Sequence, residues 1–406
     1  MPFEWLADGT VTSVPGFRAA GVACGIKPAP ALDLALVASE RPCAAAGVFT
    51  TNRFAAAPVL YDRASLAANP MDVRAVAINA GCANACTGDD GLADAREMAG
   101  LVAGALGCDT GAVLVMSTGV IGVRLPMERL RAGIPQAVQA LSGDGGAAAA
   151  RAIMTTDTRP KACAVRTQVL GRPVTVAGMA KGSGMIHPNM ATMLALIATD
   201  AATTSQVLDA LLRRAVACSF NAVTVDGDTS TNDTVLLLAN GQAGHAPLTD
   251  PDAPEAAPLA EAVLAVAVHL AQAIARDGEG ASHFVTVTVR GAASEADAWR
   301  AAKAVANSPL VKTAVYGGDP NWGRVLCAVG YSGCQVDPAH AALWFGDVAL
   351  VAGGRPLDYD EKRAAAVLQE PEVTITIDLG LGAGEATVWT CDLTHRYVDI
   401  NAHYRT

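Results

Sequence analysis

The sequence predicts a mixed α/β or α+β protein in which large sheets are covered by helices. Strand-like apolar runs recur along the whole chain, and segments with helical spacing lie between them. Several of the runs are apolar at both odd and even positions, which indicates strands that are covered on both faces. Two others, VTVTV at 285–289 and VTITI at 373–377, alternate between apolar and polar residues and predict half-buried strands.

The predicted strands are spread over the full length of the chain. In order, they occupy residues 31–39, 73–81, 112–119, 173–182, 193–201, 221–228, 234–241, 283–291, 372–380 and 384–392. A change in pattern near residue 285 divides them into two groups. We therefore expect a main domain of residues 1–285 and a smaller C-terminal α+β domain of residues 286–406, with two helices in the smaller one.

The predicted helices lie between these strands. Residues 90–106 and 127–141 have helical spacing, and Ser205 and Ser294 can each cap a helix that follows them. The segment 262–275 is the most apolar helical run. It is shorter than the about 20 apolar residues that a membrane-spanning helix needs, so we expect a buried core helix. Residues 243–257, rich in Pro, Asp and Ala, indicate a surface connection.

The composition points to a small-molecule partner. Hydrophobic residues make up 51% of the 406 residues and charged residues 17%, as in a globular protein. The formal net charge of −10, without a block of like charges, argues against a nucleic-acid or anionic-membrane surface. We expect no nucleic-acid partner and no membrane partner.

The ten cysteines predict neither a disulfide framework nor a metal site. Cys82 and Cys86 form a C-x3-C pair, but neither a second pair nor neighbouring histidines complete a zinc site. The N-terminus, MPFEWLADGT, lacks the basic and apolar regions of a secretory signal. We expect reduced cysteines, no metal and a cytoplasmic location.

The most informative stretch is KGSGMIHPNMATMLALIATDA at 181–201, where small and polar residues precede Thr192 and an apolar strand. A threonine hydroxyl is a weak nucleophile unless a base takes its proton. An N-terminal threonine carries such a base in its own α-amine, whose ordinary pKa is about 7.7–8.0. Thr192 would gain this amine only if the Ala191–Thr192 peptide bond broke. The turn-forming residues before it suit a strained, exposed peptide. An ordinary threonine that opens a strand is the alternative.

Three nearby motifs carry weaker signals. STGVIG at 117–122 follows an apolar run and can present backbone N–H groups and a hydroxyl to an anion, or it is an ordinary turn. AKGSG lacks the spacing of a phosphate-binding loop, and Lys181 is better suited to meet a substrate carboxylate unless it is simply solvated. DGEGA places Glu279 between glycines, where a solvated loop residue is the alternative.

Two further patterns have structural explanations. VDGDTSTND at 225–233 carries three aspartates but lacks the calcium-loop spacing, so we expect an Asx-rich turn between two apolar strands. Ser183 and His187 are four residues apart, so on a helix they would lie on the same face and could act as a hydrolase pair. Gly182, Gly184 and Pro188 argue against a helix there.

KGSGMIHPNMATMLA closely resembles the self-cleavage motif of the ornithine acetyltransferase family, also called glutamate N-acetyltransferase. Eight further blocks resemble the family in the same order, so the resemblance covers essentially the whole chain. They are GVFTTNRFAAAPV (47–59), INAGCANACTG (78–88), MSTGVIG (116–122), TTDTRPK (155–161), VDGDTSTND (225–233), DGEGA (277–281), NSPLVKTAVYGGDPNWGR (307–324) and INAHYRT (400–406).

The resemblance implies a layered α/β sandwich of the self-processing type and an acyltransferase of cyclic arginine biosynthesis. Cleavage between Ala191 and Thr192 yields an α chain, 1–191, and a β chain, 192–406, two of each forming a heterotetramer. The enzyme transfers an acetyl group from N2-acetyl-L-ornithine to L-glutamate through acetyl-Thr192. No cofactor is implied, and whether acetyl-CoA is a second donor stays open.

The resemblance also assigns the site residues. Thr192 is the nucleophile, Thr118 and Gly119 form the oxyanion hole, and Glu279 lies in the active site. The implied substrate contacts are Thr158, Lys181, Thr192, Glu279, Asn401 and Thr406.

Two other functions stay open at this point. A self-processing aminopeptidase or amidase would use the same nucleophile but pass the acyl group to water. A non-catalytic ligand-binding protein would keep an intact chain, which a denaturing gel would show as a single band.

Overall fold

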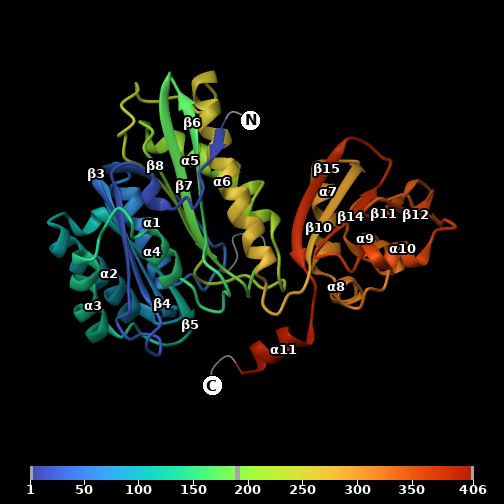
Figure 1. The fold of residues 1–406 in the computed structure, drawn as a ribbon, viewed down its shortest axis with the longest axis horizontal. Coiled ribbons are helices and arrows are strands. Elements are labelled where there is room, and N and C mark those ends of the chain that lie inside the picture. The colour runs from blue at the N-terminus through green and yellow to red at the C-terminus, as the bar shows by residue number, and fades with distance from the viewer. Residues whose placement is uncertain (1–2, 188–192, 404–406) are drawn as a thin grey trace. The chain divides into compact units, whose positions relative to one another are not determined.

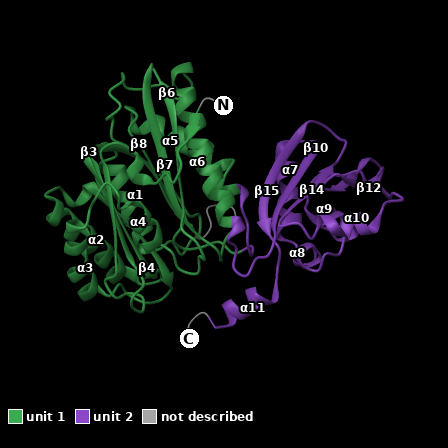
Figure 2. Cartoon of the chain, viewed as in Figure 1, with its two compact units in different colours: residues 1–221, 228–274 green, residues 222–227, 275–406 purple. Residues whose placement is uncertain are grey.

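A computed structural model of the chain describes residues 3–187 and 193–403, so Ala191, Thr192 and Thr406 lie outside the described residues. The chain divides into two compact units (Figures 1 and 2). The first unit consists of Met1–Asn221 and Asp228–Ile274, and the second of Ala222–Gly227 and Ala275–Thr406.

Within the described residues, the first unit contains a nine-stranded sheet in the order β1-β6-β7-β8-β9-β3-β4-β5, with β2 paired to β3. The strands are β1 Phe3–Trp5, β2 Phe17–Val22, β3 Leu34–Phe49, β4 Val73–Cys82, β5 Val113–Val120, β6 Lys161–Val169, β7 Arg172–Lys181, β8 Leu194–Thr199 and β9 Thr234–Ala239.

The long strand β3 joins two layers of this sheet. Its first part pairs with β4 through Leu34–Ala38, and its second part pairs with β9 through Ala44–Phe49. The exposed residues 40–42 between these parts interrupt the pairing. The two layers face each other, because residues from β4 and β5 share one buried cluster with residues from β7, β8 and β9. Examples are Ile78, Met116, Met179, Leu196 and Leu236.

Helices pack against both layers of the sheet. They are α1 Ala57–Ala68, α2 Gly88–Leu106, α3 Met127–Gln139, α4 Gly146–Ala152, α5 Ser205–Ala217 and α6 Ala257–Arg276. Figure 1 shows α2 and α3 on the outer side of β4 and β5, where Met98 and Leu130 pack into the cluster that contains Ala77 and Val115. The short helix α4 contributes Ala149 and Ala152 to the cluster between the layers. The predicted layered α/β sandwich is confirmed.

The apolar helix α6 packs on the sheet as a core helix. Among the described residues, 254–276 is the helix that is long and apolar enough to span a membrane. Its buried face contacts β7 at Gly178, where a Cβ atom would lie 2.8 Å from Leu270 Cδ1 and 2.9 Å from Val266 Cγ1. Glycine at that position therefore allows the helix to approach the strand closely.

The second unit has, within the described residues, a six-stranded sheet in the order β13-β12-β11-β14-β10-β15. The strands are β10 Phe284–Ala292, β11 Ala342–Phe345, β12 Val348–Ala352, β13 Arg355–Pro356, β14 Glu372–Asp378 and β15 Gly384–Cys391. The helices are α7 Glu295–Asn307, α8 Pro309–Tyr316, α9 Trp322–Tyr331, α10 Glu361–Val367 and α11 His395–Ala402. In β10 and β14 the valine and isoleucine residues point into the buried cluster, as the alternation predicts.

The division between the units differs from the predicted boundary at 285/286. The second unit begins at Ala275 and also takes in Ala222–Gly227. Val223 forms a bridge to Trp389, and the Thr224 amide donates a hydrogen bond to the Trp389 carbonyl at 2.9 Å. The pairing partner lies far along the chain, so a local pattern cannot reveal it.

Several elements also differ from prediction. Residues 221–228 do not form a strand; a 3-10 turn spans Phe220–Ala222. Helix α5 is capped by Thr204, whose side chain accepts a hydrogen bond from Val207 N, rather than by Ser205. Ser294 caps α7 as predicted, accepting a hydrogen bond from Asp297 N at 3.1 Å. The second half of β3 was not predicted, because CAAAGVF is too rich in small residues to show a strand pattern.

Candidate active site

The candidate site lies where the last residues of β5 and β7 meet the first residues of β8 and β9. Thr118 and Gly119 stand near the end of β5, and Lys181 is the last residue of β7. Lys181 pairs with Leu194, the first residue of β8, which follows the 188–192 segment. Leu194 in turn pairs with Thr234 of β9. The fold therefore gathers the predicted oxyanion residues, the predicted lysine and both flanks of the predicted cleavage point in the first unit.

Lys181 is buried, with 3% of its side chain exposed, and it links β7 to β5. Its Nζ atom donates to Thr155 Oγ1 at 2.7 Å and lies 3.3 Å from Thr118 Oγ1. The solvated-lysine alternative is therefore wrong. A buried ammonium that reaches the oxyanion residue is suited to bind an anionic group beside a reacting carbonyl.

Asp157 neutralises part of the positive charge around Lys181. Its Oδ1 accepts hydrogen bonds from Lys161 Nζ at 2.6 Å and from the Gly182 amide at 2.7 Å, and its Oδ2 lies 3.9 Å from Lys181 Nζ. Burial by itself raises the pKa of Asp157, but the ammonium groups of Lys181 and Lys161 outweigh it and lower that pKa to about 2. Asp157 is therefore ionised at neutral pH and fixes the backbone beside Lys181.

An Asp157→Asn variant is expected to be less stable at neutral pH by about 3–5 kcal/mol, because it leaves the ammonium of Lys161 buried opposite a neutral amide. The pKa of Asp157 lies below that of an unfolded aspartate, so its contribution is complete above about pH 4 and is lost as the pH falls toward 2. Urea unfolding at pH 7 and at pH 3 should show a difference between wild type and variant that shrinks at the lower pH. Equal midpoints at pH 7 would contradict this assignment.

The position of residue 119 requires a glycine. Its φ angle is +133°, and a Cβ atom would lie 2.2 Å from the Gly81 carbonyl carbon and 2.5 Å from Cys82 N. The parallel pairing of β4 and β5 shifts register here, between Gly81 and Cys82. A glycine is thus needed both for the dihedral angle and for the close approach of the two strands.

Asn232, in the segment predicted as an Asx-rich turn, is buried and holds the end of β5. Its Nδ2 atom donates to the Ala83 carbonyl at 2.6 Å and to the Ser117 carbonyl at 2.8 Å. Thr231 Oγ1 donates to Asn232 Oδ1 at 2.7 Å. The segment predicted as an Asx-rich turn therefore also makes buried hydrogen bonds that its sequence did not indicate. Asn232 fixes the peptide that precedes Thr118.

Asp233 was also missed as a site residue. It is fully buried, and its Oδ1 accepts a hydrogen bond from the Met193 amide at 2.9 Å. Met193 directly follows Thr192. The sequence feature that could have indicated Asp233 is TSTND, which places many hydrogen-bonding residues directly before a fully buried strand.

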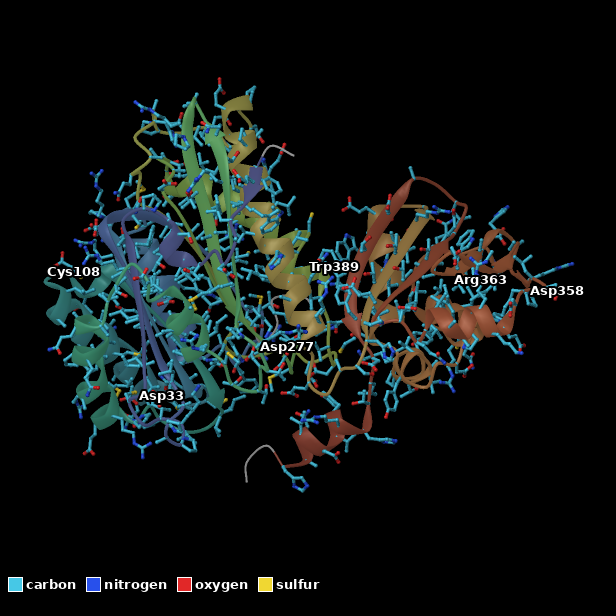
Figure 3. The ribbon with its side chains drawn as sticks, in the orientation of Figure 1. Asp33, Cys108, Asp277, Asp358, Arg363 and Trp389 are labelled. Carbon is cyan, nitrogen blue, oxygen red and sulfur yellow. The ribbon has the colours of Figure 1, made fainter. Side chains whose placement is uncertain are left out.

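Lys27 is a second lysine that the structure brings to this end of the sheet. Its Nζ donates to the Met154 carbonyl at 2.9 Å, next to the Thr155 hydroxyl that binds Lys181. Asp33, labelled in Figure 3, shapes the preceding turn by accepting hydrogen bonds from the amides of Cys24, Gly25 and Lys27. Burial lowers the pKa of Lys27. Nothing in the local sequence around GIK indicated this position.

The remaining candidates of the first unit have simple locations. Thr158 is exposed in the loop that also carries Asp157. Ser183 is buried, and its Oγ atom lies 2.7 Å from Thr156 Oγ1. Residues 182–187 are not helical, so the helix face that a Ser183–His187 pair would need is not formed.

The second unit brings Glu279 and Asn401 together. Asn401 Nδ2, from α11, donates to Glu279 Oε2 at 2.8 Å, and Glu279 is 7% exposed. Gly280 lies against α11: its φ angle is +69°, and a Cβ atom there would lie 2.6 Å from Tyr397 N. Glu279 is therefore not a solvated loop residue. Its carboxylate is held by Asn401 of helix α11.

Among the residues that the structure describes, no group of three His, Cys, Asp or Glu side chains is arranged to hold a metal ion. Two aspartates of 225–233 lie in different units. Asp226 accepts a hydrogen bond from Tyr397 Oη at 3.2 Å in the second unit, while Asp233 is buried in the first.

The fold and the site define the class of protein as a layered α/β enzyme. Its site places a buried ammonium beside a hydroxyl and a constrained glycine, which suits a small anionic substrate that carries a reacting carbonyl. The chain matches the ArgJ family over residues 18–406 and belongs to that family. The family resemblance inferred from the sequence is thereby confirmed, and with it the class of acyltransferases of arginine biosynthesis.

Individual relatives match along their whole length. The chain is 55% identical to the arginine biosynthesis bifunctional protein ArgJ of Symbiobacterium thermophilum, over 99% of this chain and 100% of the relative. It is 54% identical to ArgJ of Geobacter sulfurreducens, over 97% of this chain and 100% of the relative. Among solved structures, an ornithine acetyltransferase from Mycobacterium tuberculosis, complexed with ornithine, is 45% identical with a TM-score of 0.43, covering 46% of this chain and 98% of that chain.

Proposed function

We propose that the enzyme transfers an acetyl group from N2-acetyl-L-ornithine to L-glutamate after cleaving itself between Ala191 and Thr192. The observation that carries this proposal is the buried Lys181 ammonium, which reaches Thr118 at the strand ends that flank residues 188–192. A self-processing hydrolase or a non-catalytic binding protein does not account for membership of the ArgJ family along nearly the whole chain.

Cleavage begins with attack of Thr192 Oγ on the Ala191 carbonyl carbon. The C–N bond breaks, its nitrogen takes the hydroxyl proton, and residues 1–191 are left as an ester on Thr192. Water then hydrolyses the ester. The α chain ends in a carboxylate at Ala191, and the β chain begins with Thr192, whose hydroxyl and α-amine are restored.

Transfer then proceeds in two halves. The Thr192 amine takes the hydroxyl proton as Oγ attacks the acetyl carbonyl, and the proton passes to the amine of ornithine as its C–N bond breaks. Acetyl-Thr192 remains. The α-amine of glutamate attacks this ester, loses a proton to the Thr192 amine, and leaves as N-acetylglutamate, which restores the Thr192 hydroxyl. The ester divides one amide exchange into two steps.

The proposed roles of the other residues follow from their chemistry. Thr118 and Gly119 donate hydrogen bonds to the oxyanion, a contribution of about 3–4 kcal/mol for each donor. Lys181 binds the α-carboxylate that donor and acceptor share. Thr158, Glu279, Asn401 and Thr406 complete the substrate contacts, with Glu279 paired to an ammonium group or orienting the catalytic amine.

A Lys181→Met variant is expected to raise the KM for both N2-acetyl-L-ornithine and L-glutamate, by roughly 10- to 100-fold, because it removes a charged hydrogen bond to their common group. Steady-state kinetics with each substrate varied in turn measures both values. Lys362→Met removes a charge on the exposed helix α10 and is the control. An effect on only one of the two substrates would refute the assignment of Lys181 to the shared carboxylate.

Four further features belong to the same proposal. The cleaved enzyme assembles as a heterotetramer of two α and two β chains in the cytoplasm. Acetyl-CoA serves as a second donor, which is favoured by the word bifunctional in the names of the relatives. No cofactor takes part.

The decisive assay for the activity measures ornithine release from N2-acetyl-L-ornithine with and without L-glutamate. The proposed transferase releases ornithine stoichiometrically with N-acetylglutamate, and without glutamate it stops after one turnover. Continuous release of ornithine and acetate without glutamate would instead indicate an amidase. Replacing N2-acetyl-L-ornithine by acetyl-CoA tests the second donor.

A further inference from the structure

Asp233 has an arrangement that its surroundings in the described residues do not explain. The residue is fully buried between the start of β9 and the start of β8. One carboxyl oxygen, Oδ1, accepts the amide hydrogen of Met193 at 2.9 Å, and the other, Oδ2, has no hydrogen-bond partner among the described residues. An unpartnered polar atom in such a place costs stability and calls for a functional explanation.

The position of Asp233 along the chain supplies that explanation. Its side chain holds the amide of Met193. Met193 directly follows Thr192, whose backbone nitrogen becomes a free amine on cleavage. Because the Met193 carbonyl oxygen also accepts a hydrogen bond from the Thr234 amide at 3.2 Å, the first residue after the nucleophile is held at both its N–H and its C=O. The Asp233 backbone is itself fixed, since its carbonyl accepts the Thr50 amide at 2.9 Å.

We propose that Asp233 is the positioning residue of the nucleophile: Oδ1 fixes the Met193 amide, and the second oxygen hydrogen-bonds the amine that cleavage frees on Thr192. This proposal rests on the proposed function, in which Thr192 is the nucleophile. Asp233 does not touch the acetyl group. It acts through Met193, the residue that directly follows the nucleophile.

The protonation state of Asp233 suits this role. Burial raises the pKa of its carboxyl well above the usual range, and the Met193 amide and the Lys181 ammonium oppose this only in part. A neutral carboxyl can hydrogen-bond an amine without forming an ion pair with it. An ionised carboxylate would favour the ammonium form of Thr192, which cannot accept the hydroxyl proton.

The chain offers a matched control in Asp62. This residue is also fully buried, its Oδ1 accepts one backbone amide hydrogen from Val115 at 2.8 Å, and its Oδ2 likewise has no partner among the described residues. Asp62 lies on α1. The two carboxyls therefore carry the same structural burden, and only Asp233 adjoins the residue that follows Thr192.

The test compares Asp233→Leu and Asp233→Asn with Asp62→Leu in the full chain. Leucine has the same arrangement of heavy atoms as aspartate but cannot accept the amide hydrogen, whereas asparagine keeps an acceptor. For Asp233→Leu we expect little or no cleavage on a denaturing gel, or, in any cleaved fraction, a kcat about 100-fold lower with KM within about twofold. Asp233→Asn should restore cleavage and bring kcat within about tenfold of wild type. Asp62→Leu should lower the melting temperature but leave cleavage and kcat unchanged.

The opposite outcomes would overturn the proposal. A cleaved Asp233→Leu with wild-type kcat would show that the hydrogen bond to Met193 is unnecessary, and an equal loss of kcat in Asp62→Leu would show a general effect of buried carboxyls. If Asp233→Leu does not fold, Asp233→Asn decides: a cleaved variant that has lost 100-fold in kcat would rule out a positioning role. Each of these results leaves wild-type cleavage and transfer intact, so a failure of the proposed function itself would be seen separately, in the wild-type enzyme.

Discussion

A Thr192→Ala variant is expected to stay a single chain of 406 residues and to transfer no acetyl group. Alanine has no hydroxyl to attack the Ala191 carbonyl, so the first step of cleavage and the later formation of acetyl-Thr192 are both lost. The loss should reach the detection limit of the assay, because removing a nucleophile that forms a covalent intermediate typically costs many orders of magnitude in kcat. A denaturing gel and the acetylornithine assay together measure it.

Thr192→Ser is the control for this variant. Serine keeps the hydroxyl and, after cleavage, the α-amine, so cleavage and transfer should both persist at a reduced rate. The reduction has a physical cause, since serine lacks the branched Cβ that restricts χ1 of threonine. A Thr192→Ala protein that is cut between residues 191 and 192, or that transfers acetyl groups, would exclude Thr192 as the nucleophile.

A Gly119→Ala variant is expected to lose about 100- to 1,000-fold in kcat, with a smaller change in KM. The new Cβ atom would lie 2.2 Å from the Gly81 carbonyl carbon, and alanine rarely adopts a φ angle of +133°. The backbone at the end of β5 must therefore move. A displaced amide at residue 119 can no longer meet the oxyanion, and the loss of one such donor has this magnitude.

Gly104→Ala provides the matched control for Gly119→Ala. Gly104 lies within helix α2, and a Cβ atom there would have no other atom within 4 Å. The substitution should leave kcat unchanged and stabilise the helix by up to about 1 kcal/mol. A folded Gly119→Ala protein with wild-type kcat would show that this peptide does not serve the oxyanion.

The sequence allowed prediction of those features whose cause is local. β8 and β9 are recognisable because each is an unbroken apolar run that is buried on both faces. The core helix α6 is recognisable from its length and apolar spacing. The site roles of Lys181 and Glu279 were implied by the family resemblance, and the structure buries both.

The features that could not be predicted depend on contacts between distant parts of the chain. Asn232 holds the carbonyl of Ser117, which is 115 residues away, and Lys27 binds the carbonyl of Met154, which is 127 residues away. No local pattern encodes such pairs. The fold itself decides which of several aspartates in 225–233 is buried: Asp233 is enclosed by β8 and β9, whereas Asp228 is exposed.

The central claim is that cleavage turns an internal threonine into a nucleophile that carries its own base. Intact-mass spectrometry of the active enzyme, mixed with N2-acetyl-L-ornithine in the absence of glutamate, tests it most directly. We predict two chains, residues 1–191 and 192–406, with one added acetyl group on the second chain alone, at residue 192. Active protein with an unbroken chain, or with the acetyl group on the first chain, would contradict the account.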